Sequence, residues 1–176
     1  MNFNKIGKYF VYALFFTLGL VSNCVNPFAP RLDRSQDSKL ILTDQKSPEE
    51  VLQNFVYAYT FKDSVVYADL LDSSFVFVYF DPGLGGSGVF VSWGRDIDLR
   101  TTGRFFRNFE TISLTLNSSV YEITEGEKAE ISKTLLLNLF GDLGDFNLTG
   151  NAIFNFAKNP YDHKWRITRW KDESQM

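Results

Sequence analysis

The sequence predicts an α+β domain in which three helices in its first half pack on one face of a curved antiparallel sheet. Two observations predict this fold class. Between Ser47 and Leu71, apolar residues recur at three- and four-residue steps, which is the spacing of amphipathic helices. From Thr111 onward the period changes to two, and turn residues separate long extended stretches. Helices followed by an antiparallel meander are typical of the α+β class.

The beginning of the chain is predicted to be a secretory signal peptide. Lys5 and Lys8 form a positive start, and residues 9–21 form an apolar run that is too short to span a bilayer comfortably. The run ends in Leu-Val-Ser-Asn-Cys, and Cys24 is the only cysteine. This ending resembles the lipobox of bacterial lipoproteins, whose cysteine is lipidated and becomes the mature N-terminus. Asn23 departs from the usual small residue at its position, and the alternative is an ordinary signal peptide or a membrane anchor.

This resemblance implies a lipid anchor at Cys24 in a bacterial cell envelope, and we expect the outer membrane, on its periplasmic side. Three regions follow: a lipoprotein signal peptide at residues 1–23, a flexible tether at 24–46 and one folded domain at 47–176. Without the signal peptide the chain has 16 basic and 21 acidic residues, a formal charge of −5. This balance argues against nucleic acid as a partner.

The folded domain is predicted to start with two helices. Ser47, followed by Pro-Glu-Glu, combines a hydroxyl N-cap, proline at the first helical position and acids at the positive helix end. We expect this helix to reach about Phe61. Asp63 or Ser64 then caps a second, shorter helix that runs to about Leu71.

A strand and a flexible turn come next. Residues 75–80 are β-branched or aromatic throughout, so they predict a strand that is covered on both faces. The stretch 83–88 is rich in glycine, but it lacks the Lys-Ser/Thr ending of a phosphate-binding loop. Residues 89–91 after it predict another strand, so we interpret the glycine-rich stretch as a turn.

A third helix is predicted from Trp93 to about Asn108, with Ser92 as its cap. Trp93 and Ile97 would share one face of it with Arg100 or Thr101.

The rest of the chain predicts antiparallel strands. Alternation is clear in residues 112–116 and again in 120–124. Long strands follow at 129–140 and 146–158, and a shorter one at 164–170 closes the sheet. Gly, Asp, Asn and Pro residues mark the turns between them.

This order of elements resembles the NTF2-like superfamily, which includes ketosteroid isomerase, scytalone dehydratase and polyketide cyclases. The resemblance covers about residues 48–173, and it rests on two short motifs beside the element order. These are Phe80-Asp81-Pro82 at the end of a strand and the closing stretch from Trp165 to Trp170. The resemblance implies a cone with a pocket between the first helix and the concave face of the sheet. The family includes enzymes, binding modules and dimerisation platforms, so the fold alone does not decide the function.

For isomerase-like members, the resemblance implies an aspartate base at the end of the first strand, a tyrosine from the first helix and a second acid on a later strand. Asp81 matches the base, and Tyr57 or Tyr59 matches the tyrosine. Where the second acid would lie, the chain has Asn151 and Ala152. An isomerase- or cyclase-like enzyme with Asp81 as general base is therefore one hypothesis. The alternative is that Asp81 is a turn residue before proline.

Neither a metal nor a cofactor is predicted. His163 is the only histidine and it lies in a turn sequence, while the only cysteine, Cys24, is assigned to lipidation. The sequence therefore predicts no zinc site.

The sequence is most consistent with a tethered, non-enzymatic domain that binds a small apolar or amphipathic ligand, or an envelope protein partner. The predicted ligand pocket contains Tyr59, Tyr79, Trp93 and Arg169, because aromatic residues with a few polar groups are typical of such pockets. A third hypothesis is that the outer face of the sheet forms a homodimer or docks into an envelope complex.

Overall fold

A computed structural model describes residues 41–142 and 144–174, which belong to one compact unit. The predicted signal peptide, the predicted lipidation site Cys24 and most of the predicted tether lie outside the described residues. Within the described part, no helix is long and apolar enough to cross a membrane.

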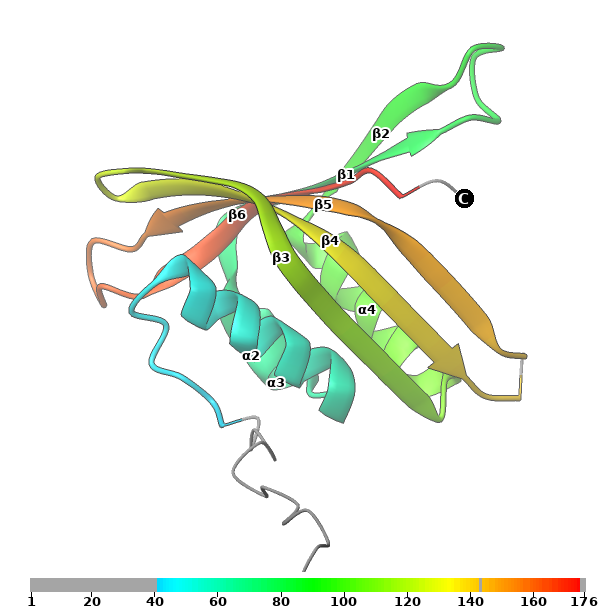
Figure 1. Cartoon of the computed structure of the whole chain (residues 1–176), viewed down its shortest axis with the longest axis horizontal. Coiled ribbons are helices and arrows are strands. Elements are labelled where there is room, and N and C mark those ends of the chain that lie inside the picture. Colours follow the sequence, from blue (N-terminus) through cyan, green and yellow to red (C-terminus); the bar gives the residue numbers. More distant parts are fainter. Residues whose placement is uncertain (1–40, 143, 175–176) are drawn as a thin grey trace, which may run out of the picture. The chain divides into compact units, whose positions relative to one another are not determined.

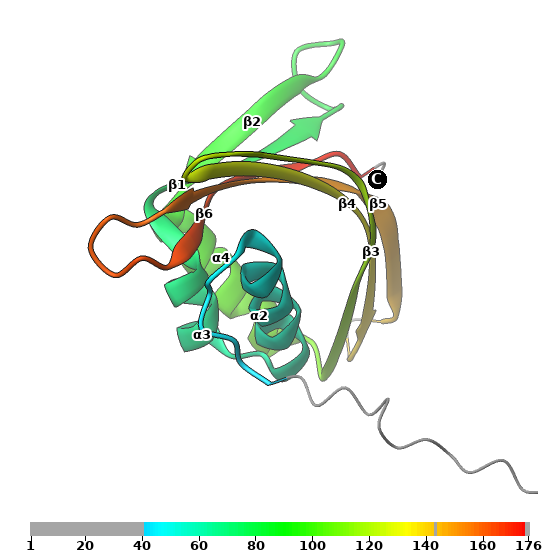
Figure 2. The same ribbon diagram turned by 60° about the vertical axis from the view of Figure 1, so that its left-hand side comes forward.

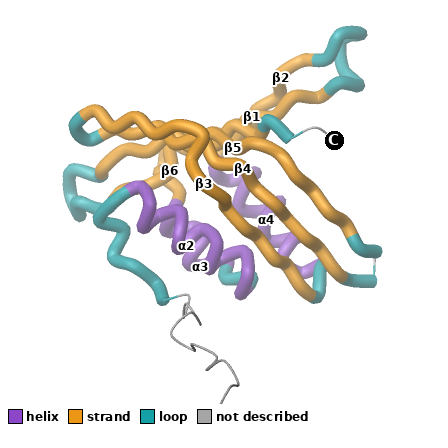
Figure 3. The backbone as a smooth tube through the Cα atoms, viewed as in Figure 1, coloured by secondary structure: helices purple, strands orange, loops and turns teal. Residues whose placement is uncertain are grey.

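The described residues form three helices and six strands, as predicted for an α+β domain (Figures 1 and 3). In chain order these are α2 (Pro48–Phe61), α3 (Ser64–Leu70), β1 (Leu71–Asp81), β2 (Val89–Gly94), α4 (Arg95–Asn108), β3 (Thr111–Glu125), β4 (Lys128–Phe140), β5 (Phe146–Lys158) and β6 (Trp165–Asp172).

The six strands form one curved sheet in the order β2-β1-β6-β5-β4-β3. The three helices lie inside its curve, on the concave face (Figure 2). One feature differs from the predicted antiparallel sheet, since β1 and β6 pair in parallel, with Phe77 opposite Trp170 and Tyr79 opposite Asp172. The hairpin with β5 sets the direction of β6, so β6 enters between β5 and β1 parallel to β1.

The predicted starts of the first two helices are confirmed in detail. Ser47 Oγ accepts a hydrogen bond from the Glu50 amide at 3.2 Å, which caps α2. Lys62 ends this helix in the left-handed conformation, at φ 56°. The carboxylate of Asp63 then accepts from the amides of Val65 and Val66, and α3 begins at once. The two helices therefore meet at a sharp corner.

The third helix differs from its prediction in start and orientation. Trp93 belongs to β2, where it pairs with Phe77, and α4 begins two residues later at Arg95. Ile97, predicted to share a helix face with Trp93, is 48% exposed. The buried residues are instead Asp98, Thr102 and Phe106. Two of these three are polar, so the buried face could not be recognised from apolar spacing.

Part of the predicted tether belongs to the folded domain. The Thr43 amide donates to Asn54 Oδ1 at 2.8 Å, and Asn54 Nδ2 donates back to the Thr43 carbonyl at 3.1 Å. The Gln45 carbonyl accepts from the Trp165 amide at 2.9 Å, and Gln45 is only 2% exposed. The fold thus includes residues that precede Ser47.

The strands contribute most of the core, and irregularities in their pairing curve the sheet. Irregular pairing in β3 between Leu116 and Tyr121 marks β-bulges, which bend the long β3–β4 ribbon. At one end of the strands the concave face is fully packed, and we call this region the closed end. Its central side chains are Phe75, Ile131, Phe156 and Ile167, each at most 2% exposed.

Candidate functional site

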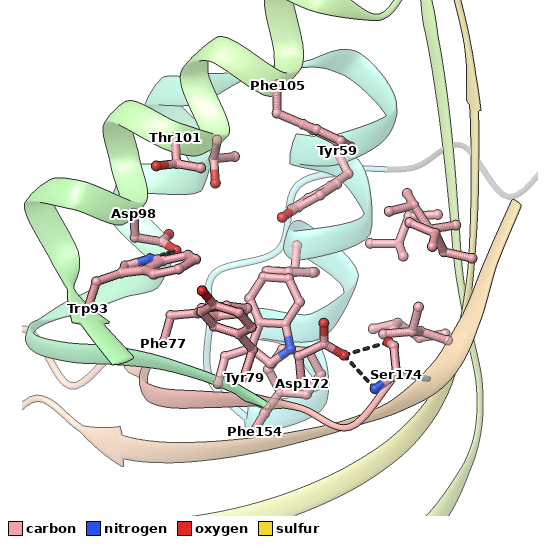
Figure 4. A pocket seen from close by; sticks show the side chains of 18 residues that line it. Tyr59, Phe77, Tyr79, Trp93, Asp98, Thr101, Phe105, Phe154, Asp172 and Ser174 are labelled. Atoms are coloured by element: carbon pink, nitrogen blue, oxygen red, sulfur yellow. Dashed lines mark hydrogen bonds between the residues drawn. The ribbon is translucent and has the colours of Figure 1, made fainter. Parts of the chain in front are cut away.

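Opposite the closed end, the same strands line a cavity of about 470 Å³ beneath α2 and α4 (Figure 4). We call this region the open end. Eighteen residues line the cavity: Phe55, Tyr59, Phe77, Tyr79, Trp93, Asp98, Thr101, Thr102, Phe105, Leu114, Leu116, Leu135, Leu137, Leu148, Phe154, Trp170, Asp172 and Ser174.

One wall of the cavity is aliphatic because the strand period of two places leucines on its inner face. Leu137 pairs with Leu114 on β3 and with Leu148 on β5, so one row of leucines crosses three strands. Leu135 pairs with Leu116 on β3 in the next row. This wall offers no hydrogen-bonding side chain.

The opposite wall is aromatic and comes from β1, β2 and β6. The ring centroids of Phe77 and Trp93 lie 4.6 Å apart in a stacked arrangement, and Trp170 meets Phe77 edge-on at 4.8 Å. Tyr79 lies 5.2 Å from Trp93. The indole Nε1 of Trp170 is buried without a hydrogen-bond partner among the described residues.

Asp98 is the most buried acid that faces the cavity, at 3% exposed. Its Oδ2 accepts a hydrogen bond from the Tyr67 hydroxyl at 2.6 Å, and its Oδ1 accepts from Trp93 Nε1 at 3.0 Å. Burial raises the pKa of Asp98, while these two hydrogen bonds oppose the rise by favouring the charged form. Burial, together with the negative charges of neighbouring groups, raises the pKa of Tyr67 well above its ordinary value.

Tyr59 projects from α2 into the cavity beside this cluster (Figure 4). Its ring centroid lies 5.8 Å from that of Tyr67. Burial is the main reason why the pKa of Tyr59 is raised, and the charge of Asp98 adds to the effect. Tyr59 therefore stays protonated and can donate or accept a hydrogen bond.

A second carboxylate, Asp172, enters the cavity from the end of β6 (Figure 4). Its Oδ1 accepts hydrogen bonds from both the amide and the hydroxyl of Ser174. Among the described residues, no group donates to its Oδ2. Ser174 can lie here because it passes directly over Gly150, where any side chain would collide with it.

The lining residues carry two acids and no Lys, Arg or His. The basic residues of β6 lie elsewhere. Lys171 pairs with Glu173 at 2.5 Å and lies 5.0 Å from the ring centroid of Phe90, while Arg169 is exposed. Any charge in the cavity is therefore negative.

Three of the four pocket residues predicted from the sequence line the cavity: Tyr59, Tyr79 and Trp93. Arg169 does not, because the alternation of β6 turns it away from the side that Trp170 and Asp172 occupy.

Asp81, the candidate base, does not line the cavity. It lies at the end of β1, in the β1–β2 hairpin that projects away from the helices (Figure 1). Its Oδ1 accepts from the Gly83 amide at 2.8 Å, so the side chain organises the turn. Tyr57, one of the two tyrosines matched to the isomerase-like pattern, is also absent from the lining and packs on Phe61 at 4.6 Å between ring centroids.

The structure also describes the two residues at the expected place of the second acid, and the only histidine. Asn151 and Ala152 lie on β5, and neither lines the cavity. His163 is exposed in the β5–β6 turn at φ 59°. Within residues 41–142 and 144–174, no group of three or more His, Cys, Asp or Glu side chains is arranged to hold a metal ion.

Sequence reasoning missed Asp98, Tyr67 and Asp172. A usable signal existed for Asp98, since it is spaced four residues from Thr102 and eight from Phe106, on one helical face. For Asp172, the continuation of the β6 alternation from Trp170 would have sufficed.

No family model and no curated protein matches the sequence. Solved structures do match it. A nuclear transport factor 2 (NTF2-like) superfamily protein from Salmonella enterica serovar Typhimurium has a TM-score of 0.59 at 15% identity, over 72% of this chain and 87% of that one.

Two further matches have provisional enzyme names. One, from Streptomyces avermitilis, is provisionally named a dehydratase of the NTF2-like family; its TM-score is 0.58 at 18% identity, over 76% of this chain and 96% of that one. The other, from Novosphingobium aromaticivorans, is provisionally named a scytalone dehydratase; its TM-score is 0.60 at 16% identity, over 73% of this chain and 81% of that one. Together with the helices inside the curved sheet and the cavity beneath them, these matches show that the chain carries a domain with the NTF2-like fold.

Proposed function

We propose that this domain binds a small apolar or amphipathic molecule in the cavity at its open end. The observation that carries the proposal is the lining, an aliphatic wall facing an aromatic wall with a few polar groups between them. The volume of about 470 Å³ lies within the range of roughly 300–1,000 Å³ typical of small-molecule sites. Such a space suits a fused aromatic body or a short alkyl chain.

The few polar side chains of the lining are better placed to orient a bound ligand than to hold water throughout the cavity. Tyr59, Tyr79 and the free Oδ2 of Asp172 lie among apolar side chains, so they are available to matching polar groups of a bound molecule. An apolar site with few polar groups gains most of its affinity from burial and its specificity from those groups.

The test is binding of the hydrophobic fluorophore N-phenylnaphthylamine to the full chain. We expect saturable binding, and Leu137→Trp should weaken it by about tenfold or more because the added ring occupies the cavity. Leu84→Trp is the matched control, since Leu84 is 48% exposed in the hairpin turn and lies outside the lining. Equal affinities of the two variants would contradict the proposal.

The buried cluster of Asp98 and Tyr67 favours a second candidate, an enzyme of the isomerase or dehydratase type. Asp98 has the raised pKa and the enclosed position that a general base needs, and Tyr59 is placed to donate to a developing oxyanion. The provisional dehydratase names of two similar structures agree with this candidate. The base would then be Asp98 and not Asp81, which lies outside the cavity.

Hydrogen–deuterium exchange at the α-carbons of a small cyclic ketone, such as tetralone, tests this candidate by NMR. We expect exchange catalysed by the full chain to be lost in Asp98→Asn and kept in Asp81→Asn. Exchange that is absent, or that survives Asp98→Asn, would exclude Asp98 as a base.

The lipid anchor stays part of the proposal, on the sequence alone. We infer that Cys24, which lies outside the described residues, is acylated and holds the domain on an envelope membrane. Labelled palmitate should enter the wild-type chain in a bacterial host and should not enter Cys24→Ser. Pairing of two copies, or docking to an envelope protein, is likewise a prediction, for which sedimentation at rising concentration is the measurement.

A further inference from the structure

We propose that the cavity selects cationic ligands, apolar amines whose ammonium group is held by Asp172 against the aromatic wall. This inference rests on the proposed binding function and names the chemical class of its ligand. It follows from three features of the lining: its charge, the free oxygen of Asp172 and the aromatic side chains that share the cavity with it.

Charge is the first feature. The cavity has the carboxylates of Asp98 and Asp172 in its lining and no basic side chain to balance them. In a mainly apolar enclosure, water screens such charges poorly, so their effect on a ligand is larger than at the surface. A carboxylate or phosphate ligand would meet repulsion without a basic side chain to pair with it, whereas an ammonium group would be attracted.

The free oxygen distinguishes Asp172 from Asp98. Both oxygens of Asp98 already accept hydrogen bonds, from Tyr67 and from Trp93. In Asp172 the two donors from Ser174 both go to Oδ1, which fixes the carboxylate and leaves Oδ2 without a donor among the described residues. A held carboxylate with one unoccupied oxygen is a preorganised acceptor for an N–H donor.

The aromatic wall supplies the rest of an ammonium site. Tyr79 is the register neighbour of Asp172 across the parallel β1–β6 pair, and both side chains face the cavity. Phe77 and Trp93 continue the ring surface from Tyr79, with centroids 6.0 and 5.2 Å away. An ammonium group beside a carboxylate and over aromatic faces gains both charge pairing and cation–π attraction.

The remaining volume then takes the apolar body of the ligand. The row of Leu114, Leu137 and Leu148 belongs to the same cavity and has no polar side chain. The inferred ligand is thus amphipathic, with a cationic head near Asp172 and an apolar body along the leucines.

The experiment compares three ligands that share one ring system: naphthylethylamine, naphthylethanol and naphthylacetate. Each is measured at neutral pH by displacement of N-phenylnaphthylamine from the full chain. We expect the amine to bind about tenfold more tightly than the alcohol, as a charge-assisted hydrogen bond implies, and the carboxylate to bind most weakly.

Three variants test which side chains cause the preference for the amine. Asp172→Asn keeps an oxygen for the Ser174 donors and removes the charge, so it should weaken the amine by about tenfold and change the alcohol little. Glu173→Gln is the matched control, because it removes the same charge one residue away on an exposed side chain. Tyr79→Leu should weaken the amine more than the alcohol, which gives a second readout that is independent of Asp172.

Two outcomes would overturn the inference, and only the second would also overturn the proposed binding function. If all three ligands displace the probe and the amine shows no advantage, or if Glu173→Gln matches Asp172→Asn, the cavity binds small molecules without selecting cations. If the fluorophore itself fails to bind, the proposed function and the selection fail together.

Discussion

The closed end and the open end of this domain are built from the same strands, yet one is solid and the other hollow. Along β1, Phe75 is buried in the core and Phe77 borders the cavity; along β6, Ile167 is buried and Trp170 borders it. Both ends are rich in aromatic and aliphatic residues, so composition does not separate them. What differs is the helix surface that faces each end.

At the closed end, α2 and α3 present apolar side chains that meet the sheet directly. Val51 and Leu70 are each 0% exposed. At the open end, α4 presents Asp98, Thr101 and Thr102 beside Phe105, and these three short polar side chains leave space above the leucines unfilled. A cavity in this fold therefore arises where a polar helix face lies across an apolar strand face.

The sharpest test of this comparison removes one aliphatic side chain from each end of β4. Ile131→Ala should lower the free energy of unfolding by about 2–5 kcal/mol, since Ile131 is fully buried and its loss leaves a void. Leu137→Ala only enlarges an existing cavity, and we expect a loss of about 1 kcal/mol. Urea denaturation of both variants gives the comparison, and equal losses would show that the open end is packed as tightly as the closed end.

A smaller effect is expected from the pH dependence of stability in Asp98→Asn. Burial raises the pKa of Asp98 above 3.8 in the folded chain, so the folded state holds this proton more tightly than the unfolded state. The contribution of Asp98 is therefore most favourable below its unfolded pKa and is lost as the pH rises through the folded pKa. Asn does not titrate, so the variant should gain stability relative to wild type across this window.

Urea denaturation at several pH values from about 3 to 7 measures that difference. The hydrogen bonds from Tyr67 and Trp93 oppose the shift, so we expect the change to be smaller than the loss in Ile131→Ala. A stability difference that stays constant with pH would mean that the pKa of Asp98 is the same in the folded and the unfolded chain, and the open end would then be wetter than its lining suggests.

The smallest effect should come from Asp81→Asn in the projecting hairpin. Asn keeps an oxygen that can accept from the Gly83 amide, so stability should change by less than about 0.5 kcal/mol. Binding of N-phenylnaphthylamine should not change, because Asp81 is not part of the lining. A clear loss of binding would mean that the hairpin contributes to the binding site, and that the site extends beyond the open end.

The local rules of the sequence predicted much of this fold. Ser47 and Asp63 begin helices in the structure as their capping chemistry requires. The strand Phe146–Lys158 has the predicted bounds, because its apolar alternation and the turns beside it are unambiguous. The predicted start of the third helix at Trp93 was wrong, since a bulky aromatic residue next to glycine suits both a strand end and a helix start.

The site was less predictable because it depends on contacts between distant elements. Tyr59, Tyr79 and Trp93 could be selected as aromatic residues on elements expected to face inward. The bond from Tyr67 to Asp98 joins residues 31 positions apart on two helices, and no sequence period reports such a contact. The alternation of β6 turns Asp172 inward, but its position opposite Tyr79 depends on the parallel pairing of β1 with β6, which an antiparallel meander did not predict.

The central position of β6 has a consequence for the order of folding. Every other described strand precedes β6 in the chain, yet β6 lies between β1 and β5 and is their only link within the sheet. Until it is synthesised, the hairpin of β1 and β2 and the meander of β3, β4 and β5 each keep an unpaired edge. We therefore expect a nascent chain to form two separate pieces of sheet before β6 joins them, and late joining of distant segments is a slow kind of folding step.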